Sequence, residues 1–391
     1  MNNKKQKILW LIILSIIFIL TSCNESKETL TEANEQIEKE SQSIENNNEE
    51  IELEEKEEIS EIPEPQEPQE IVIAFMGDVM MDSYIGDYIR ERGVDYPWED
   101  VADITREADL AVINLETSVS TRGSTKKPEG YGFRSNPDSL QGLVNSGIDL
   151  VSLANNHTLD FGEDAFYDTL ESLDQYKIAY VGGGKNKDEA EQVRIIEMNG
   201  IKVGFLAFTS IIPWSSWEAT EDKPGAAIYK TEYKERILQN IKEASKECDI
   251  LTLIPHWGVE YAQVPSDWQR ELAHDMIDAG ADIVVGHHSH VLQGIEFYKD
   301  KPILYSIGNF IFLKNDDLCG RTGIIELTLD KEGFIKGKFY PVNIQYCKAN
   351  LLNKEEGRGK EIIDMLRDLS ASFGTIINEK GEIQKPNTVE E

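Results

Sequence analysis

The chain has 391 residues, of which 72 are acidic and 39 basic, and its formal net charge is −33 at neutral pH. Nucleic-acid binding depends on clustered Lys and Arg contacts to phosphates, which a chain this acidic does not favour, so we do not expect nucleic acid as a partner. The length beyond the first 70 residues, about 320, suits one large α/β domain.

The first 23 residues have the pattern of an export signal. Lys4, Lys5 and Lys7 precede an apolar run over residues 8–20, which is short for a membrane span and right for the core of a signal peptide. The run ends in Leu-Thr-Ser-Cys23, which resembles the lipobox of bacterial lipoproteins. We expect Cys23 to be lipidated and the rest to be extracytoplasmic and tethered to the cell membrane, in an envelope typical of Gram-positive bacteria. An uncleaved anchor helix and a soluble secreted form are the alternatives.

Residues 24–70 form an acidic segment with 18 Glu, 3 Lys and no aromatic side chain. Such a composition buries too little apolar surface to offset the entropy of ordering, which predicts a disordered, extended stalk. A cation- or partner-binding role for the segment is the alternative.

Residues 71–345 alternate strand-like apolar runs with helical patterns, which predicts a largely parallel sheet. The expected helices cover residues 136–146, 162–176, 231–247 and 266–279. Residues 323–329 and 337–342 read as a closing hairpin. Residues 346–391 are predicted to be a helical C-terminal tail, with a helix over about 354–371.

Polar clusters end six of the apolar runs. Since ligand-binding groups collect beyond the carboxyl ends of parallel strands, we expect all six to meet at one edge of one sheet. The clusters lie at Asp78, Asn114 to Glu116, Asn155 to His157, His256, His287 to His290, and Asn309.

These clusters predict a metal site of mixed nitrogen and oxygen ligands. Imidazole suits zinc and iron, carboxylate and amide oxygens suit manganese, and a central carboxylate can bridge two ions. We expect one or two divalent ions, with Mn, Zn or Fe as candidates. His287 is left out of the predicted ligand set, because adjacent residues tend to point apart. The predicted ligands are Asp78, Glu116, Asn156, His256, His288 and His290.

Other residues near the clusters suggest catalytic and binding roles. His157 would remain off the metal as a general acid, oriented by Asp160, for which a helix N-cap is the alternative. Arg134 could bind a substrate carboxylate or phosphate, or form a surface ion pair. Trp257 could stack on substrate or pack under a loop. Glu260 could accept a hydrogen bond from His256.

The series of motifs resembles the CapA family of poly-γ-glutamate capsule synthesis proteins, which is related to the calcineurin-like metallophosphoesterases. The resemblance rests on GDVM (77–80), NLET (114–117), ANNHTLD (154–160), HWGVE (256–260), GHHSHVLQG (286–294) and SIGNF (306–310). It implies a four-layer α/β/β/α sandwich with Asp78 as first metal ligand and Glu116 as the bridging one. Asn156 and His157 would be the Asn-His pair, His256 the following lone histidine, and His288 and His290 the closing pair.

Two positions depart from the phosphoesterase pattern. Met80 stands where a ligand histidine is usual, and Thr158 where an acid follows the Asn-His pair. Asn114, Asp82 or water could replace the missing imidazole, or the site could hold a single ion.

The resemblance implies a metal-dependent hydrolase or transferase acting in synthesis, release or anchoring of poly-γ-glutamate or a related anionic envelope polymer. The alternatives are a non-catalytic accessory subunit of a membrane-bound polyglutamate synthetase and, less favoured, a general extracellular phosphoesterase.

Overall fold

The computed structural model describes residues 69–125, 127–128, 131–313 and 316–386. The chain divides into two units, Met1–Glu67 and Pro68–Glu391, and the second is described here. The predicted signal peptide, Cys23 and the stalk lie outside the described residues. Among the residues that are described, no helix is both long and apolar enough to cross a bilayer.

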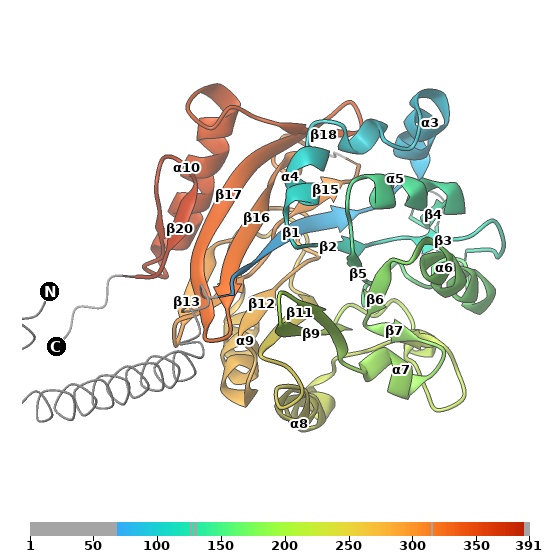
Figure 1. Cartoon of the computed structure of the whole chain (residues 1–391). Helices are drawn as coiled ribbons and strands as arrows, with labels where there is room; N and C mark the ends of the chain where they lie inside the picture. The colour runs from blue at the N-terminus through green and yellow to red at the C-terminus, as the bar shows by residue number, and fades with distance from the viewer. Residues whose placement is uncertain (1–68, 126, 129–130, 314–315, 387–391) are drawn as a thin grey trace, which may run out of the picture. The chain divides into compact units, whose positions relative to one another are not determined.

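The larger sheet has ten strands (Figure 1). Its parallel half runs β1–β2–β5–β6, and an antiparallel half continues from β1 through β16 and β17. The strands are β1 (Ile71–Val79), β2 (Leu110–Leu115), β5 (Leu150–Ser152), β6 (Ala179–Val181), β15 (Asn309–Ile311), β16 (Arg321–Asp330), β17 (Gly333–Gln345), β18 (Lys348–Leu351), β19 (Ile376–Ile377) and β20 (Glu382–Gln384). The antiparallel pair β16–β17 confirms the expected hairpin.

The second sheet has six strands in the order β13-β14-β12-β11-β9-β8, with a parallel centre and an antiparallel strand at each edge. They are β8 (Arg194–Met198), β9 (Ile201–Thr209), β11 (Ile250–His256), β12 (Ile283–Val285), β13 (Ile295–Tyr298) and β14 (Lys301–Leu304). Two small pairs complete the strands: β3 (Ser118–Val119) with β4 (Arg134–Ser135), and β7 (Gly183–Gly184) with β10 (Gly225–Ala226).

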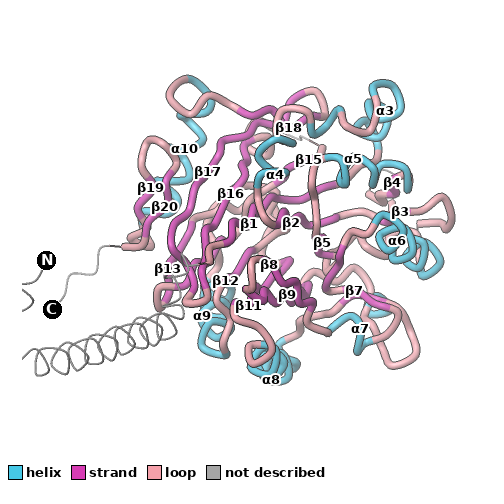
Figure 2. Tube along the Cα trace, viewed as in Figure 1, coloured by secondary structure: helices cyan, strands magenta, loops and turns pink. Residues whose placement is uncertain are grey.

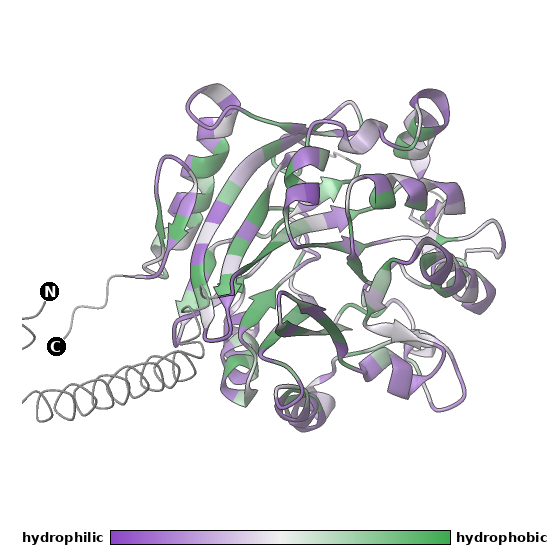
Figure 3. Ribbon diagram, viewed as in Figure 1, coloured by the Kyte–Doolittle hydropathy of each residue, from purple (hydrophilic) through white to green (hydrophobic). Residues whose placement is uncertain are grey.

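Three apolar clusters separate four layers of structure. Side chains of both sheets, among them Phe75 and Phe205, share one cluster and so pack face to face. A second cluster joins the other face of the larger sheet to helices such as α6, and a third joins the smaller sheet to α8 and α9. Hydrophilic residues colour the outward sides of α6 and α8 (Figure 3). The predicted α/β/β/α sandwich is confirmed, whereas the expectation of a single sheet is wrong.

The expected helices are present with shorter bounds. Strong end signals explain some of these bounds: in α9, for example, Ser266 and Gln269 form a capping box, and Gly280 ends the helix in a left-handed conformation. The helices are α3 (Ser83–Arg92), α4 (Ala102–Glu107), α5 (Leu140–Asn145), α6 (Glu163–Tyr176), α7 (Lys187–Glu191), α8 (Lys234–Ala244), α9 (Asp267–Ala279) and α10 (Gly357–Ala371).

The C-terminal region is not the separate helical tail that we expected. Figure 2 shows strands as well as a helix in it, and β18 and β20 both pair with β17 of the larger sheet. Ile362, Ile363 and Leu366 of α10 belong to the cluster between the sheets. Alternation of apolar residues in the short strands β19 and β20 is too brief to be read reliably from sequence.

Candidate metal centre

Strand ends of both sheets contribute to one buried group of polar side chains. Asp78 is the second-to-last residue of β1, and Glu116 directly follows β2 in the larger sheet. His256 ends β11, and His288 and His290 follow β12 in the smaller sheet. All five side chains are buried. The motifs therefore meet at one place, as predicted. That place lies between the facing ends of two sheets and not at one edge of a single sheet.

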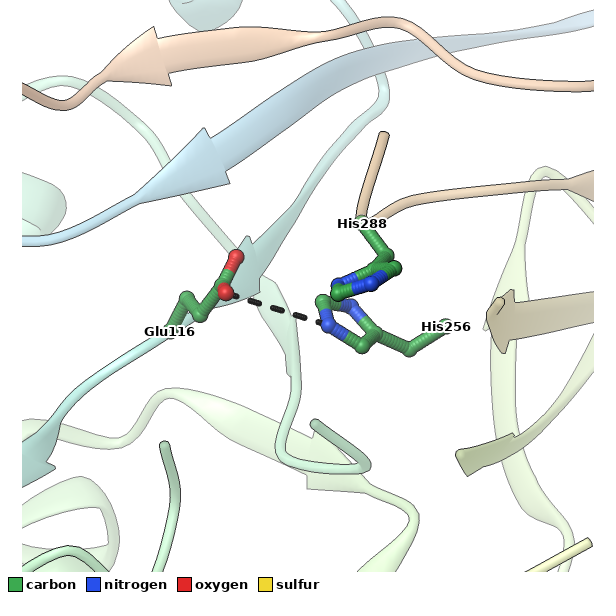
Figure 4. Close-up of side chains that lie close together, drawn as sticks. All are labelled: Glu116, His256 and His288. Atoms are coloured by element: carbon green, nitrogen blue, oxygen red, sulfur yellow. Dashed lines mark ion pairs between the residues drawn. The ribbon is translucent and has the colours of Figure 1, made fainter. Parts of the chain in front are cut away.

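Glu116 is the centre of this group. Its Oε1 atom lies 3.8 Å from Nε2 of His157, 3.8 Å from Nε2 of His256 and 3.9 Å from Nε2 of His290. These separations are too long for hydrogen bonds. Figure 4 shows the carboxylate facing the rings of His256 and His288. Three imidazoles thus surround one carboxylate oxygen without bonding to it.

The donor set fits a divalent metal ion. Three triads bring one ligand atom from each member within 4.8 Å of the others: Glu116, His256 and His288; Asp78, Glu116 and His290; and Glu260, His288 and His290. Glu116 Oε1 and His288 Nδ1 are buried without a hydrogen-bond partner among the described residues. Ligands that each bind an ion at about 2.0–2.2 Å are separated from one another by about 3–4 Å. A metal ion between these ligand atoms would satisfy them at the spacing that the structure shows.

Amide side chains hold the acids and one histidine in place. Asn114 donates from Nδ2 to Asp78 Oδ1 at 2.9 Å and to Glu116 Oε2 at 3.3 Å. Asn155 in turn donates to Asn114 Oδ1 at 3.1 Å. Asn156 Oδ1 lies 2.7 Å from His256 Nε2, so these two predicted ligands lie side by side.

His287 belongs to the site, although it was left out of the predicted ligand set. Its Nδ1 lies 3.0 Å from Asp78 Oδ1. The expectation assumed an extended backbone, but His288 and His290 have φ values of 92° and 58°. Positive φ is strained for residues with a side chain and turns the loop so that neighbouring rings face the same region. The HHSH sequence alone carries no signal of this turn.

Burial and neighbouring charges shift the pKa values of the acids and histidines in this group. Burial and the nearby Asp78 raise the pKa of Glu116 well above its usual value. Burial opposes a charge on His290, but Glu116 and Asp78 outweigh it and raise the pKa of His290 to about 10. Burial and His290 lower the pKa of His288 to about 3, and burial and His288 lower that of His256 well below its usual range. Neutral His256 and His288 each keep a lone pair for a metal.

His157 and Asp160 form a pair, as their sequence spacing suggested. His157 Nδ1 lies 2.7 Å from Asp160 Oδ2, which also accepts the backbone N–H of Phe133 at 2.8 Å. Sequence reasoning missed Lys127, whose ammonium lies 2.6 Å from Asp160 Oδ1 and 3.0 Å from His157 Nδ1. Burial lowers the pKa of His157 despite Asp160. The ring is thus neutral and fixed in orientation.

Trp257 does not offer a surface to substrate, which corrects that prediction. The ring is 0% exposed, and its Nε1–H donates to the carbonyl oxygen of Tyr305 at 3.2 Å. The sequence does not show whether an aromatic residue next to a motif histidine faces a cleft or the core.

Arg134 and Glu260 are also placed differently from the expectation. The guanidinium of Arg134 donates to the carbonyl oxygens of Arg122 and Gly123 and lies 4.3 Å from the ring centre of Phe161. It therefore braces a loop instead of forming the surface ion pair considered as an alternative. Glu260 groups with His288 and His290, not with His256.

Comparison with known proteins gives consistent family matches. The family described as "Bacterial capsule synthesis protein PGA_cap" matches residues 72–314. The chain is 31% identical to the "PGA biosynthesis protein CapA" of Bacillus subtilis (strain 168), with 74% of this chain and 76% of the relative covered. It is 29% identical to the "Capsule biosynthesis protein CapA" of Bacillus anthracis, covering 71% and 68%. A "Probable polyglutamine synthesis accessory protein" of Mycobacterium tuberculosis (strain ATCC 25618 / H37Rv) is 29% identical over 55% of this chain and 59% of that relative.

Solved structures give more distant matches. A hypothetical protein from Thermus thermophilus aligns with a TM-score of 0.45 at 16% identity, covering 70% of this chain and all of that one. A phosphatase from Mycoplasma pneumoniae aligns with a TM-score of 0.45 at 13% identity, covering 71% and 94%.

Proposed function

The chain belongs to the bacterial capsule synthesis protein family, and from that premise we propose that it is a metal-dependent hydrolase or transferase of the cell envelope. Its relatives are named for capsule and PGA biosynthesis, which supports a role in making a polyglutamate capsule. The substrate we propose is poly-γ-glutamate or a related anionic polymer, whose synthesis, release or anchoring the protein would serve.

One observation carries the catalytic proposal. The Oε1 atom of Glu116 is buried without a hydrogen bond to any described residue, and three imidazole nitrogens surround it at 3.8–3.9 Å. A buried carboxylate oxygen without a hydrogen bond is costly, and proteins keep such groups where they serve a site. Asp78, Glu116, Asn156, His256, His288 and His290 would hold one or two divalent ions, whose Lewis acidity would polarise a scissile carbonyl or phosphoryl group.

His157 would handle the proton. Its Nδ1–H donates to Asp160, which leaves a lone pair on Nε2, the atom that faces Glu116. Because the neutral ring is favoured by burial, Nε2 would take the proton that the attacking water loses and then deliver it to the leaving group. Lys127 supports this order, since its ammonium beside Nδ1 disfavours a permanent positive charge on the ring.

A cavity beside this pair could admit substrate. A cavity of about 560 Å³ is lined by Asp160, Phe161, Trp214 and Trp217, together with the glycines and acids around them. Trp214 is 37% exposed, so it presents ring surface to the cavity rather than to the core. Of the pair, Asp160 belongs to this lining and His157 does not, so a polymer chain bound there would lie beside Asp160.

A non-catalytic accessory subunit of a membrane-bound synthetase is the second candidate. Met80 in place of a ligand histidine favours it, and one relative carries the word accessory in its name. In that case the metal would stabilise the fold, and His157 would be dispensable for the subunit's activity.

Metal content and turnover distinguish the two candidates. We would purify the full chain in detergent and measure bound metal by elemental analysis for wild type, His288→Ala and His157→Ala, with hydrolysis of poly-γ-glutamate and of a chromogenic phosphodiester in parallel. The enzyme proposal expects metal to be lost only with His288 and turnover to be lost with both. Metal in wild type without turnover of either substrate would favour the accessory subunit, and no metal in any of the three would remove the basis of the site.

We also propose that Cys23 anchors the chain to the outer face of the membrane. The lipobox-like sequence before it supports this placement. Cys23→Ala is expected to move the protein from the membrane fraction to the soluble fraction of the envelope. Retention of the variant in the membrane would instead indicate an uncleaved anchor.

A further inference from the structure

Met80 does not occupy the metal-ligand position that a histidine would fill. The Met80 side chain is fully buried and belongs to the apolar cluster on the outer face of the larger sheet. Its sulfur accepts the backbone N–H of Asp82 at 3.1 Å. The triad of Asp78, Glu116 and His290 therefore has three ligands where a tetrahedral ion takes four.

Both protein side chains that the sequence offered as replacements make hydrogen bonds to other parts of the chain. The Asp82 carboxylate accepts the backbone N–H of Arg134 at 2.8 Å. Asn114 uses its amide nitrogen on Asp78 and Glu116 and its oxygen on Asn155. His287 holds Asp78 through Nδ1 and joins none of the triads of potential ligands among the described residues.

Glu260 is held against the open side of the site. It follows β11 by four residues, in a loop where Gly258 and Tyr261 have φ values of 92° and 64°. The backbone N–H of Tyr261 donates to the carbonyl oxygen of Ser289 at 2.7 Å, which joins this loop to the one that carries His288 and His290. A carboxylate oxygen of Glu260 comes within 4.8 Å of ligand atoms on both histidines.

We propose that Glu260 is a direct metal ligand that forms an ion position together with His288 and His290 and so supplies a ligand in place of the imidazole missing at Met80. The inference rests on the metal centre of the proposed function. Glu260 differs from the other ligands because it is exposed to solvent, whereas they are buried. The ion it binds is thus the one nearer the solvent, and His288 is shared with the buried triad of Glu116, His256 and His288.

The charges around Glu260 agree with this role. Without an ion, Asp78, Glu116 and Glu260 repel one another. Two divalent cations would neutralise that charge, which a single cation would do incompletely.

The test is the stoichiometry and affinity of Mn²⁺ binding to the full chain after chelation, measured by equilibrium dialysis. Wild type is expected to bind two equivalents. Glu260→Gln should retain one equivalent with unchanged affinity and bind the other at least about tenfold more weakly. Glu260→His should restore the second equivalent and change the visible absorption of the Co²⁺ form, because nitrogen replaces oxygen at the ion.

Glu271→Gln on the exposed side of α9 is the matched control and should behave as wild type. Two full equivalents in Glu260→Gln would overturn the inference while leaving the metal centre intact. Equal weakening in Glu260→Gln and Glu260→His would also overturn it, by showing that charge and not ligation matters. Absence of any Mn²⁺ binding in wild type would overturn the proposed function together with this inference.

Discussion

Glu116 follows a strand of the larger sheet and His256 ends a strand of the smaller one, yet Glu116 Oε1 lies 3.8 Å from His256 Nε2. The distance is set by the packing of one sheet on the other, because no pairing among the described strands connects the two sheets. An ion held by both residues would therefore cross-link the sandwich. Side chains in the cluster between the sheets control the geometry of the site from a distance.

Glu116→Gln is expected to abolish metal binding and to stabilise the metal-free protein. The buried Oε1 atom has no hydrogen bond to the described residues, and removing its charge ends the repulsion from Asp78. The gain should be about 1–3 kcal/mol in the free energy of unfolding, measured by urea titration in the presence of a chelator. A less stable variant in chelator would show that Glu116 is satisfied in the metal-free protein.

Lys127→Met should destabilise the fold by about 3–5 kcal/mol, because it leaves the carboxylate of Asp160 buried without a cation. The double variant Lys127→Met with Asp160→Asn should recover part of that loss, since neither charge then remains. Urea titrations of the two single variants and the double variant give the coupling. Lys299→Met, in an ion pair with Asp278 that is about half exposed, should cost no more than about 1 kcal/mol.

Gly77→Ala should displace Asp78. A Cβ at Gly77 would lie 1.9 Å from the carbonyl oxygen of Gly308, where β1 meets β15. The backbone has to move, and we expect a loss of about 3 kcal/mol in stability together with weaker Mn²⁺ binding. Gly86→Ala in α3 is the comparison, because its Cβ would approach no atom closer than 3.2 Å. Unchanged Mn²⁺ affinity in Gly77→Ala would show that Asp78 tolerates the shift.

Leu366→Ala tests whether the C-terminal helix is part of the core. Leu366 is 0% exposed in α10 and belongs to the cluster between the sheets. The expected cost is about 2–5 kcal/mol in the free energy of unfolding. Leu351→Ala, at a side chain 38% exposed, should cost far less. Similar small losses in both variants would restore the interpretation of a loosely attached tail.

The positions of the site residues could be predicted from sequence because they depend on strand ends. An apolar run that stops at Asp78, Glu116 or His256 marks the same edge of a sheet wherever the strand lies. The division into two sheets could not be derived in this way, since a buried strand reads as an apolar run in either sheet. The four layers came from the resemblance to a known family, and the structure confirms them.

The sequence did not predict the direction in which side chains next to the motif histidines point. Trp257 and His287 both lie next to motif histidines, yet one ring turns into the core and the other toward Asp78. The difference depends on backbone angles in the loops after β11 and β12, which tertiary packing imposes. Lys127 was overlooked for a similar reason, because its partner Asp160 lies 33 positions later in the chain.

The pairing of β1 has a consequence for the order in which the molecule can form. Its parallel neighbour β2 follows within the next 40 residues, but its antiparallel neighbour β16 begins only at Arg321. A chain emerging from the ribosome therefore carries an unpaired strand edge for most of its synthesis, and such edges invite pairing with other chains. Complete pairing of β1, which carries Asp78, has to wait for β16, so we expect the metal centre to reach its native geometry late in folding.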